Sequence, residues 1–153
     1  MGAAAILLMT LQGCAALMPE RAPLDWRVEQ IMRQEGPTAD DVRWAYTIVI
    51  ENPGRQAVTL FRETVQLNWD KVSLSPDAAQ VRHVIPSRAA VRIERVSTFQ
   101  KREFQATSPG SPGRPPDAPL RVDGMWIYWQ FLGRYEDGHA IILNVDVFPG
   151  RRR

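Results

Sequence analysis

The sequence has few of the residues on which most catalytic and metal sites depend. Its 153 residues include one cysteine and two histidines. A single cysteine excludes an internal disulfide framework and any cysteine-rich metal site. His83 and His139 have no Cys, His or acidic residue at metal-ligand spacing, such as HxH or HExxH. We therefore expect both histidines to be ordinary surface side chains.

Sequence motifs for nucleophilic catalysis and phosphate binding are also missing. No serine lies in a GxSxG elbow. Prolines interrupt the glycine-containing stretch 110–113, and a proline has no N–H to donate to a phosphate. The sequence predicts no catalytic residue, no cofactor and no enzyme activity.

Positive and negative charges are nearly balanced in the sequence that precedes the C-terminal tail. The formal net charge is +2, from 17 arginines and 2 lysines against 17 acids. Three of those arginines form the basic C-terminal tail, 150–153. Without them the balance is slightly acidic, which gives no support for a nucleic-acid-binding face.

No apolar run is long enough to cross a membrane. Residues 2–11 are uncharged and mostly apolar, but a spanning helix needs roughly 20 such residues. The run matches the hydrophobic region of a secretory signal peptide, typically about 7–15 residues. Leu11, Gln12, Gly13 and Cys14 follow it and resemble the lipobox of bacterial lipoproteins.

This resemblance implies a definite maturation. A peptidase removes the signal peptide, 1–13, and acyl chains such as palmitate are attached at Cys14. Segment 14–25 would then be the lipid-anchored tether. The protein would face the periplasm of a bacterial cell envelope, and Ala15 after the cysteine favours the outer membrane over the inner one. The alternative is that the N-terminal apolar run is retained as a helix in which Cys14 is a small buried side chain.

The rest of the chain has the patterns of β-strands. In "VRWAYTIVIEN" the apolar residues Val42, Trp44, Tyr46, Ile48 and Ile50 alternate, so we expect them on one face. Further strands are expected in 26–33, 56–69, 88–104 and on both sides of the turn 136–138, with a bulge between Leu60 and Phe61 and short edge pieces in 70–86. The Pro/Gly-rich segment 105–121 is expected to be a mobile loop.

The stretches "YTIVIENPGRQAVTL" and "YWQFLGRYEDGHAIILNVDVF" resemble small immunoglobulin-like or fibronectin-type sandwiches of bacterial envelope proteins. They are also similar to the sandwich domains of late-embryogenesis-abundant and water-stress proteins. The resemblance implies an all-β fold: one immunoglobulin-like β-sandwich of about seven antiparallel strands, covering 26–149. It also implies a non-catalytic protein, although the fold alone assigns no function.

Acidic pairs in expected turns are the nearest approach to a metal site. They are Asp40–Asp41 and Glu136–Asp137, with Asp77 and Asp123 elsewhere. Calcium needs six to eight oxygen ligands, and no DxDxDG-like run supplies them. We predict that these acids are solvated or cap local backbone, so no metal site is expected.

Aromatic residues point to a contact surface. Along the strand after Gly124, Trp126 and Tyr128 share one face, while Ile127 and Trp129 share the other. Because a sandwich strand normally exposes one face to solvent, the second apolar face needs a cover. The candidates are the tether, the Pro-rich loop, the membrane or another protein, for which Trp126 and Tyr128 would be anchors.

Together these features predict a lipid-anchored envelope protein that binds or helps to assemble another envelope component. Its expected partners are the membrane, through lipid on Cys14, and a protein; no nucleic acid is expected. One alternative is an accessory subunit of a larger membrane-associated complex. Another is a small-ligand or carbohydrate-binding module that uses the aromatic residues as stacking platforms.

Overall fold

The computed structural model describes residues 21–69, 72–74, 76–106 and 125–148. Antiparallel β-strands make up almost all of this part of the chain, and the single helix has six residues. The elements are β1 (Asp25–Glu35), β2 (Asp41–Asn52), β3 (Val58–Trp69), β4 (Val72–Ser73), β5 (Asp77–Ile85), β6 (Ala89–Gln100), α1 (Lys101–Ala106), β7 (Met125–Tyr135) and β8 (Ala140–Val147). The predicted all-β class, with seven long antiparallel strands, is confirmed.

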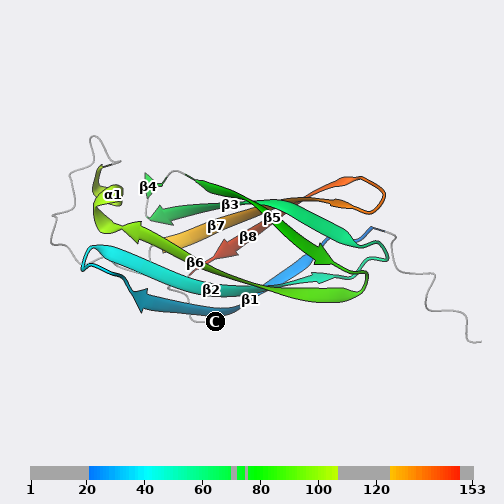
Figure 1. Ribbon diagram of the computed structural model, residues 1–153, viewed down its shortest axis with the longest axis horizontal. Coiled ribbons are helices and arrows are strands. Elements are labelled where there is room, and N and C mark those ends of the chain that lie inside the picture. Colours follow the sequence, from blue (N-terminus) through cyan, green and yellow to red (C-terminus); the bar gives the residue numbers. More distant parts are fainter. Residues whose placement is uncertain (1–20, 70–71, 75, 107–124, 149–153) are drawn as a thin grey trace, which may run out of the picture.

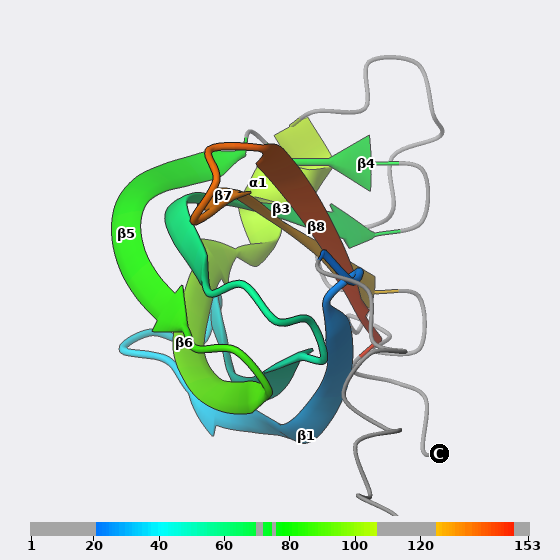
Figure 2. The same ribbon diagram turned by 90° about the vertical axis from the view of Figure 1, so that its right-hand side faces the viewer.

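The strands form two sheets that pack face to face (Figures 1 and 2). Sheet A has the order β1-β2-β6. Sheet B has the order β4-β3-β7-β8, and β5 pairs with the same edge of β3 as β4. The core lies between the sheets, and it includes Trp129 and Phe131 of β7, both fully buried.

The central strand of sheet A follows the alternation expected from its sequence. Val42, Trp44, Tyr46, Ile48 and Ile50 all point into the core, and none is more than 4% exposed. Burying a large apolar side chain contributes about 1.5–3 kcal/mol, so this one row supplies a substantial share of the stability. The prediction for this strand is confirmed.

A register shift interrupts β3 between Leu60 and Arg62, opposite both β5 and β7. The shift confirms the bulge predicted from the apolar phase of the sequence. Because an extra residue reverses which side chains face inward, Leu60 and Glu63 both point into the core. The bulge therefore places an acidic residue between the two sheets.

The hairpin of β7 and β8 turns where the sequence predicts it. Gly138 has a φ of 89°, a backbone conformation that favours glycine. The backbone N–H of Tyr135 donates to the carbonyl of His139 at 2.9 Å and closes the turn.

The strand predicted for 88–104 is too long: β6 ends at Gln100, and α1 follows it. The Glu103 carboxylate accepts a hydrogen bond from the Gln100 backbone N–H at 2.8 Å, and the Lys101 N–H donates to the Asp40 carbonyl at 3.0 Å. These two bonds satisfy N–H groups that would otherwise have no partner at the helix start.

Segment 70–86 also differs in detail from the expected short edge pieces. It holds the two-residue β4 and the nine-residue edge strand β5, and Pro76 and Pro86 bound β5 instead of interrupting it. The packed part of the chain also begins before residue 26, because Ala22 and Leu24 are buried.

Candidate functional site

The outward-facing side of sheet B carries the most distinctive surface in the described part of the chain. On β7 the side chains alternate: Ile127 and Trp129 are fully buried, while Trp126 and Tyr128 are half-buried on the opposite side. The two-sided apolar pattern predicted from the sequence is therefore present. We call this surface the aromatic face; its members are Trp126, Tyr128, Gln130, Leu132, Ile142, Asn144, Asp146 and Phe148.

Three aromatic rings lie together at one end of the aromatic face. Trp126 and Phe148 are stacked, with 6.3 Å between ring centroids and 19° between planes. Trp126 also meets Tyr128 edge to face at 6.4 Å and 72°. Phe148 is 40% exposed. This group is a rigid, amphipathic contact area of the kind that is enriched at binding surfaces.

Uncharged polar groups lie beside these rings. The Tyr128 hydroxyl donates to Asn144 Oδ1 at 2.8 Å. The Gln130 amide Nε2 donates to the Tyr128 hydroxyl and to Asn144 Oδ1, each at 3.0 Å. Because these groups already bond to one another, their orientations are fixed, and their remaining donors and acceptors can meet a partner without further ordering.

The other end of the aromatic face is aliphatic. Leu132 on β7 lies directly opposite Ile142 on β8, and Ile142 is 62% exposed. The face therefore runs from aromatic through amide and phenol to aliphatic groups. Asp146, directly opposite Tyr128, adds one negative charge. An arrangement of apolar anchors around mostly uncharged hydrogen-bonding groups suits the surface of a protein or a sugar better than a strongly anionic ligand.

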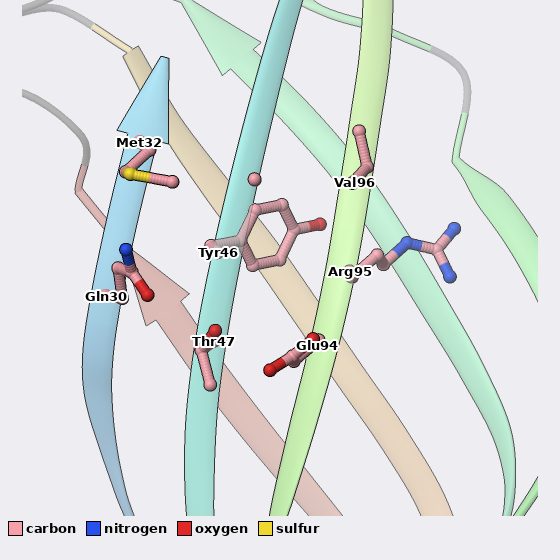
Figure 3. Close-up of a pocket in the computed structure, with 8 residues that line it drawn as sticks. Gln30, Met32, Tyr46, Thr47, Glu94, Arg95 and Val96 are labelled. Carbon is pink, nitrogen blue, oxygen red and sulfur yellow. The ribbon is translucent and has the colours of Figure 1, made fainter. Parts of the chain in front are cut away.

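The outer side of sheet A is chemically different. A shallow hollow of about 230 Å³ lies over it, with Gln30 and Met32 on β1 and Glu94 and Val96 on β6 (Figure 3). Ala45, on β2, lies directly between Met32 and Val96. Because the alanine side chain is short, it does not fill the gap between these two larger side chains, and the hollow results.

Ion pairs lie on the same outer side of sheet A, beyond the hollow. Arg92 pairs with Glu29 at 2.9 Å and with Glu94 at 3.5 Å, and Arg27 pairs with Glu51. Exposed pairs of this kind are typical of a solvated strand surface. Sheet A is therefore a weaker candidate than sheet B.

A polar cluster inside the sandwich was not predicted from the sequence. Glu63 on β3 forms an ion pair with Arg95 on β6 and accepts a hydrogen bond from Trp129 Nε1 at 3.1 Å. Arg95 also pairs with Asp77 at 2.6 Å. The side chains of Glu63 and Arg95 are only 8% and 16% exposed. The only signal in the sequence was the phase shift at the β3 bulge, which turns Glu63 inward.

The same cluster borders a cleft of about 450 Å³ between β6 and the β4–β5 edge. Nearby, the Tyr46 hydroxyl and Ser97 Oγ are hydrogen-bonded at 2.7 Å, and burial raises the pKa of Tyr46. The ion pairs of Arg95 with Glu63 and Asp77 join the two sheets, whereas the Tyr46–Ser97 bond links β2 to β6 within sheet A. The arrangement thus supplies inter-sheet cross-links in which the arginine is neutralised by two carboxylates.

His83 and His139 lie on different elements, β5 and the β7–β8 turn. His83, on β5, is half-buried and contacts the Phe131 ring edge to face at 6.3 Å, so the prediction of a surface side chain is wrong for it. Burial lowers the pKa of His83. His139 is exposed, as predicted, and its Nδ1 lies 3.1 Å from Asp137 Oδ1.

The acids singled out in the sequence have local partners. Asp41 accepts hydrogen bonds from the Thr38 backbone N–H at 2.9 Å and hydroxyl at 2.7 Å, and these bonds lower the pKa of Asp41 against the opposing effect of desolvation. Asp137 bonds with Arg21 and His139. In the described ranges, no group of three His, Cys, Asp or Glu side chains is placed to hold a metal ion.

Several predictions fall outside the described residues. They concern the motif residues Leu11, Gln12, Gly13 and Cys14, the calcium candidate Asp123, most of loop 105–121 and the tail 150–153. Within the residues that are described, no helix is long and apolar enough to cross a membrane.

The fold places the chain among all-β proteins built from two antiparallel sheets. No protein family and no curated protein sequence matches it. Among solved structures, a Northeast Structural Genomics Consortium target is similar, with a TM-score of 0.53 and 15% identity over 82% of this chain and 84% of that one. The putative ApaA protein from Bordetella pertussis matches with a TM-score of 0.53 and 11% identity, covering 84% of this chain and 94% of its own.

A putative late-embryogenesis-abundant protein superposes more loosely. Its TM-score is 0.49 and its identity 11%, over 82% of this chain and 68% of that one. At these identities, the two better matches show a shared fold and nothing about function.

Proposed function

We propose that this chain is a lipid-anchored protein of the bacterial cell envelope, and that it binds or helps to assemble another envelope component through its aromatic face. The observation that carries the binding role is the group of Trp126, Tyr128 and Phe148 on the same face as the exposed Ile142. Burying such a surface against a partner removes apolar area from water at about 25 cal/mol per Å².

We propose further that the two sheets form an immunoglobulin-like sandwich of the fibronectin type. The order β1-β2-β6 would correspond to strands A, B and E, and β3-β7-β8 to strands C, F and G. The edge pieces β4 and β5 beside β3 would take the place of strand C′. Sandwiches of this kind commonly present a sheet face or their end loops to partners.

The anchor rests on the motif Leu11-Gln12-Gly13-Cys14 after an apolar run. Lipidation at a cysteine with more than one acyl chain gives stable membrane attachment, whereas a single chain gives only marginal binding. The first buried residue in the described part of the chain is Ala22, and Cys14 precedes it by eight positions, so acyl chains on Cys14 leave that packing undisturbed. The protein would face the periplasm, with the outer membrane favoured by Ala15.

Replacing the anchoring residue tests the first half of this proposal. Cys14→Ser protein should carry no lipid label and should leave the membrane fraction after a high-salt wash. The matched control is Ser87→Ala, which changes an exposed residue of the folded domain. Cys14→Ser protein that still fractionates with membranes after the wash would contradict the anchor.

Site-specific cross-linking tests the second half. A photo-reactive residue at Ile142, on the aromatic face, should give one discrete cross-linked product in intact cells. The same residue at Met32, 48% exposed on sheet A, should give none. Equal products from both positions would argue against a dedicated face. Co-purification in fixed stoichiometry after detergent extraction would favour the accessory-subunit alternative.

One observation favours a carbohydrate-binding module as the second candidate. Tyr128, Gln130 and Asn144 place uncharged hydrogen-bonding groups beside the aromatic rings, and sugars combine hydroxyls with apolar C–H faces. If the partner is a glycan, the purified domain should sediment with isolated envelope polysaccharide, and Trp126→Ala should abolish this. Cross-linking to a protein without sedimentation would exclude this candidate.

A further inference from the structure

The first described residues of the chain are fastened to one end of the sandwich. The Tyr135 hydroxyl donates to the Ala22 carbonyl at 2.8 Å, and Arg21 Nε pairs with Asp137 Oδ2 at 2.6 Å. Ala22 is 4% and Leu24 is 7% exposed. The point from which the chain leads back toward Cys14 is therefore fixed beside the β7–β8 turn.

Three turns gather at this end, which Figure 2 views along the strands. We call it the turn end; it comprises residues 53–57, 86–88 and 136–139. The backbone N–H of Arg88 donates to the Gly54 carbonyl at 3.2 Å, and Glu136 N–H donates to the Ala57 carbonyl at 3.1 Å. Asp137 Oδ2 accepts from Gln56 Nε2 at 3.2 Å. These bonds join the turns into one surface, at the opposite end from α1 (Figure 1).

Covalent length limits how far this end can be from an anchor at Cys14. Six residues, 15–20, separate Cys14 from Arg21, and a fully extended chain spans at most about 3.6 Å per residue, or roughly 25 Å over seven steps. A strand of twelve residues such as β6 is about 40 Å long. The turn end therefore lies within roughly 25 Å of Cys14. When the strands stand perpendicular to the membrane, the α1 end is farther from the anchor by the length of a strand.

The turn end also carries charge suited to phosphate. Arg55 and Arg88 are exposed, and neither forms an ion pair within the described residues. The exposed Glu136 offsets one of these charges, and Asp137 is paired with Arg21, so the two arginines leave the turn end with a net positive charge. Arg88 has a φ of 56°, so the backbone turns sharply there. Arginine near an anionic lipid surface contributes about 1 kcal/mol each.

We infer that the turn end is the membrane-facing surface of the protein, with Arg55 and Arg88 against phospholipid headgroups and the strands standing away from the bilayer. This inference rests on the proposed acylation of Cys14. It follows that the aromatic face, on the side of the sandwich, is not pressed against the lipid and is open to a partner in the periplasm.

Fluorescence quenching in vesicles tests this orientation, and the single native cysteine makes site-specific labelling straightforward. Once Cys14 is acylated, a cysteine introduced elsewhere is the only free thiol. Ser87→Cys lies in the turn end, and Thr98→Cys lies at the far end of β6, exposed. Each labelled, lipidated full-length protein is reconstituted into phosphatidylethanolamine/phosphatidylglycerol vesicles that carry a headgroup-attached quencher.

The fluorophore at position 87 should be strongly quenched, and the one at position 98 should stay close to its unquenched intensity. Equal quenching at both positions would mean that the molecule lies flat, and stronger quenching at position 98 would mean that it is inverted; either overturns the inference while leaving the anchor intact. Protein that does not float with the vesicles would overturn the anchor and the orientation together.

A double variant of the Arg21–Asp137 pair tests whether the fastening of the N-terminal segment causes this orientation. Arg21→Gln with Asp137→Asn releases the N-terminal segment, so the difference in quenching between positions 87 and 98 should shrink. The matched control, Asp146→Asn, changes a half-buried acid of β8 away from the turn end and should leave the difference unchanged. An undiminished difference in the released variant would overturn the role given to the Arg21–Asp137 pair.

Discussion

At the scale of single residues, the most consequential side chain is Glu63. Its carboxylate lies between the sheets, paired with Arg95 and hydrogen-bonded by Trp129 Nε1. A buried ion pair adds little over an apolar replacement of both partners, but removing one partner leaves a buried charge without compensation. Glu63 and Arg95 therefore fix how the sheets are aligned more than they add to stability.

Glu63→Gln should lower the free energy of unfolding by about 3 kcal/mol, because Arg95 keeps its charge and loses its better-buried partner. Urea titration followed by tryptophan fluorescence measures this. Arg92→Ala, which removes an exposed pair with Glu29, is the control and should cost less than about 1 kcal/mol. Similar losses in the two variants would show that the inter-sheet pair has no special role.

At the scale of elements, the sequence predicted the strands with strong alternation and mispredicted those without it. In β2 every apolar residue of one phase is buried, and the β3 bulge lies where the phase changes. The end of β6 was missed because Lys101–Ala106 has no sharp break, and only the contacts of Lys101 with Asp40 and of Gln100 with Glu103 define the helix start. The Lys101–Asp40 contact is invisible in a local pattern, whereas the Gln100–Glu103 contact, three residues apart, was a local signal that the sequence offered.

Two glycines of the β7–β8 hairpin should respond differently to alanine. At Gly138 an added Cβ meets nothing within 4 Å, so the cost arises only from its φ of 89° and should be about 1 kcal/mol. At Gly133 the Cβ would lie 2.6 Å from the Thr59 carbonyl oxygen and 2.7 Å from Leu60 Cδ2.

Gly133→Ala should therefore cost more than about 2 kcal/mol, because two paired strands must separate. Thermal unfolding of both variants, followed by circular dichroism, gives the comparison. A larger loss for Gly138→Ala than for Gly133→Ala would contradict the packing described for β3 and β7.

At the scale of the whole molecule, the candidate site was only partly predictable. The sequence placed Trp126 and Tyr128 on one side of a strand because alternation is local. It did not reveal Phe148 and Asn144 as their neighbours, or Ile142 as the neighbour of Leu132, since those contacts depend on the register of β8 against β7. The fastening of Arg21 to Asp137 spans 116 positions in the chain, which no local pattern can show.

The fastening of the N-terminal segment should depend on pH. Desolvation raises the pKa of Asp137, but hydrogen bonds from the His139 backbone, Arg21 and Gln56 outweigh it and hold the pKa well below the usual value of 3.8. A carboxyl group whose folded pKa is depressed stabilises the fold above its unfolded pKa and loses this contribution as pH falls below about 3.8. The fastening is thus complete at neutral pH and weakens in acid.

NMR titration of the Ala22 and Leu24 amide resonances measures this weakening. In the native sequence both should move together as the pH falls from 4 toward the pKa of Asp137. In Asp137→Asn they should occupy the released position already at neutral pH, and Asp146→Asn should titrate like the native protein. A step that persists in Asp137→Asn would assign the titration to another group.

The proposed function depends most on Cys14 as a lipid anchor, because the site of action, the orientation and the access to the aromatic face all follow from it. Mass spectrometry of the N-terminal peptide, from protein extracted with detergent out of native membranes, tests it most directly. We predict a peptide that begins at Cys14 and carries acyl chains. A peptide that runs uncut through Leu11-Gln12-Gly13-Cys14 with a free thiol would contradict it.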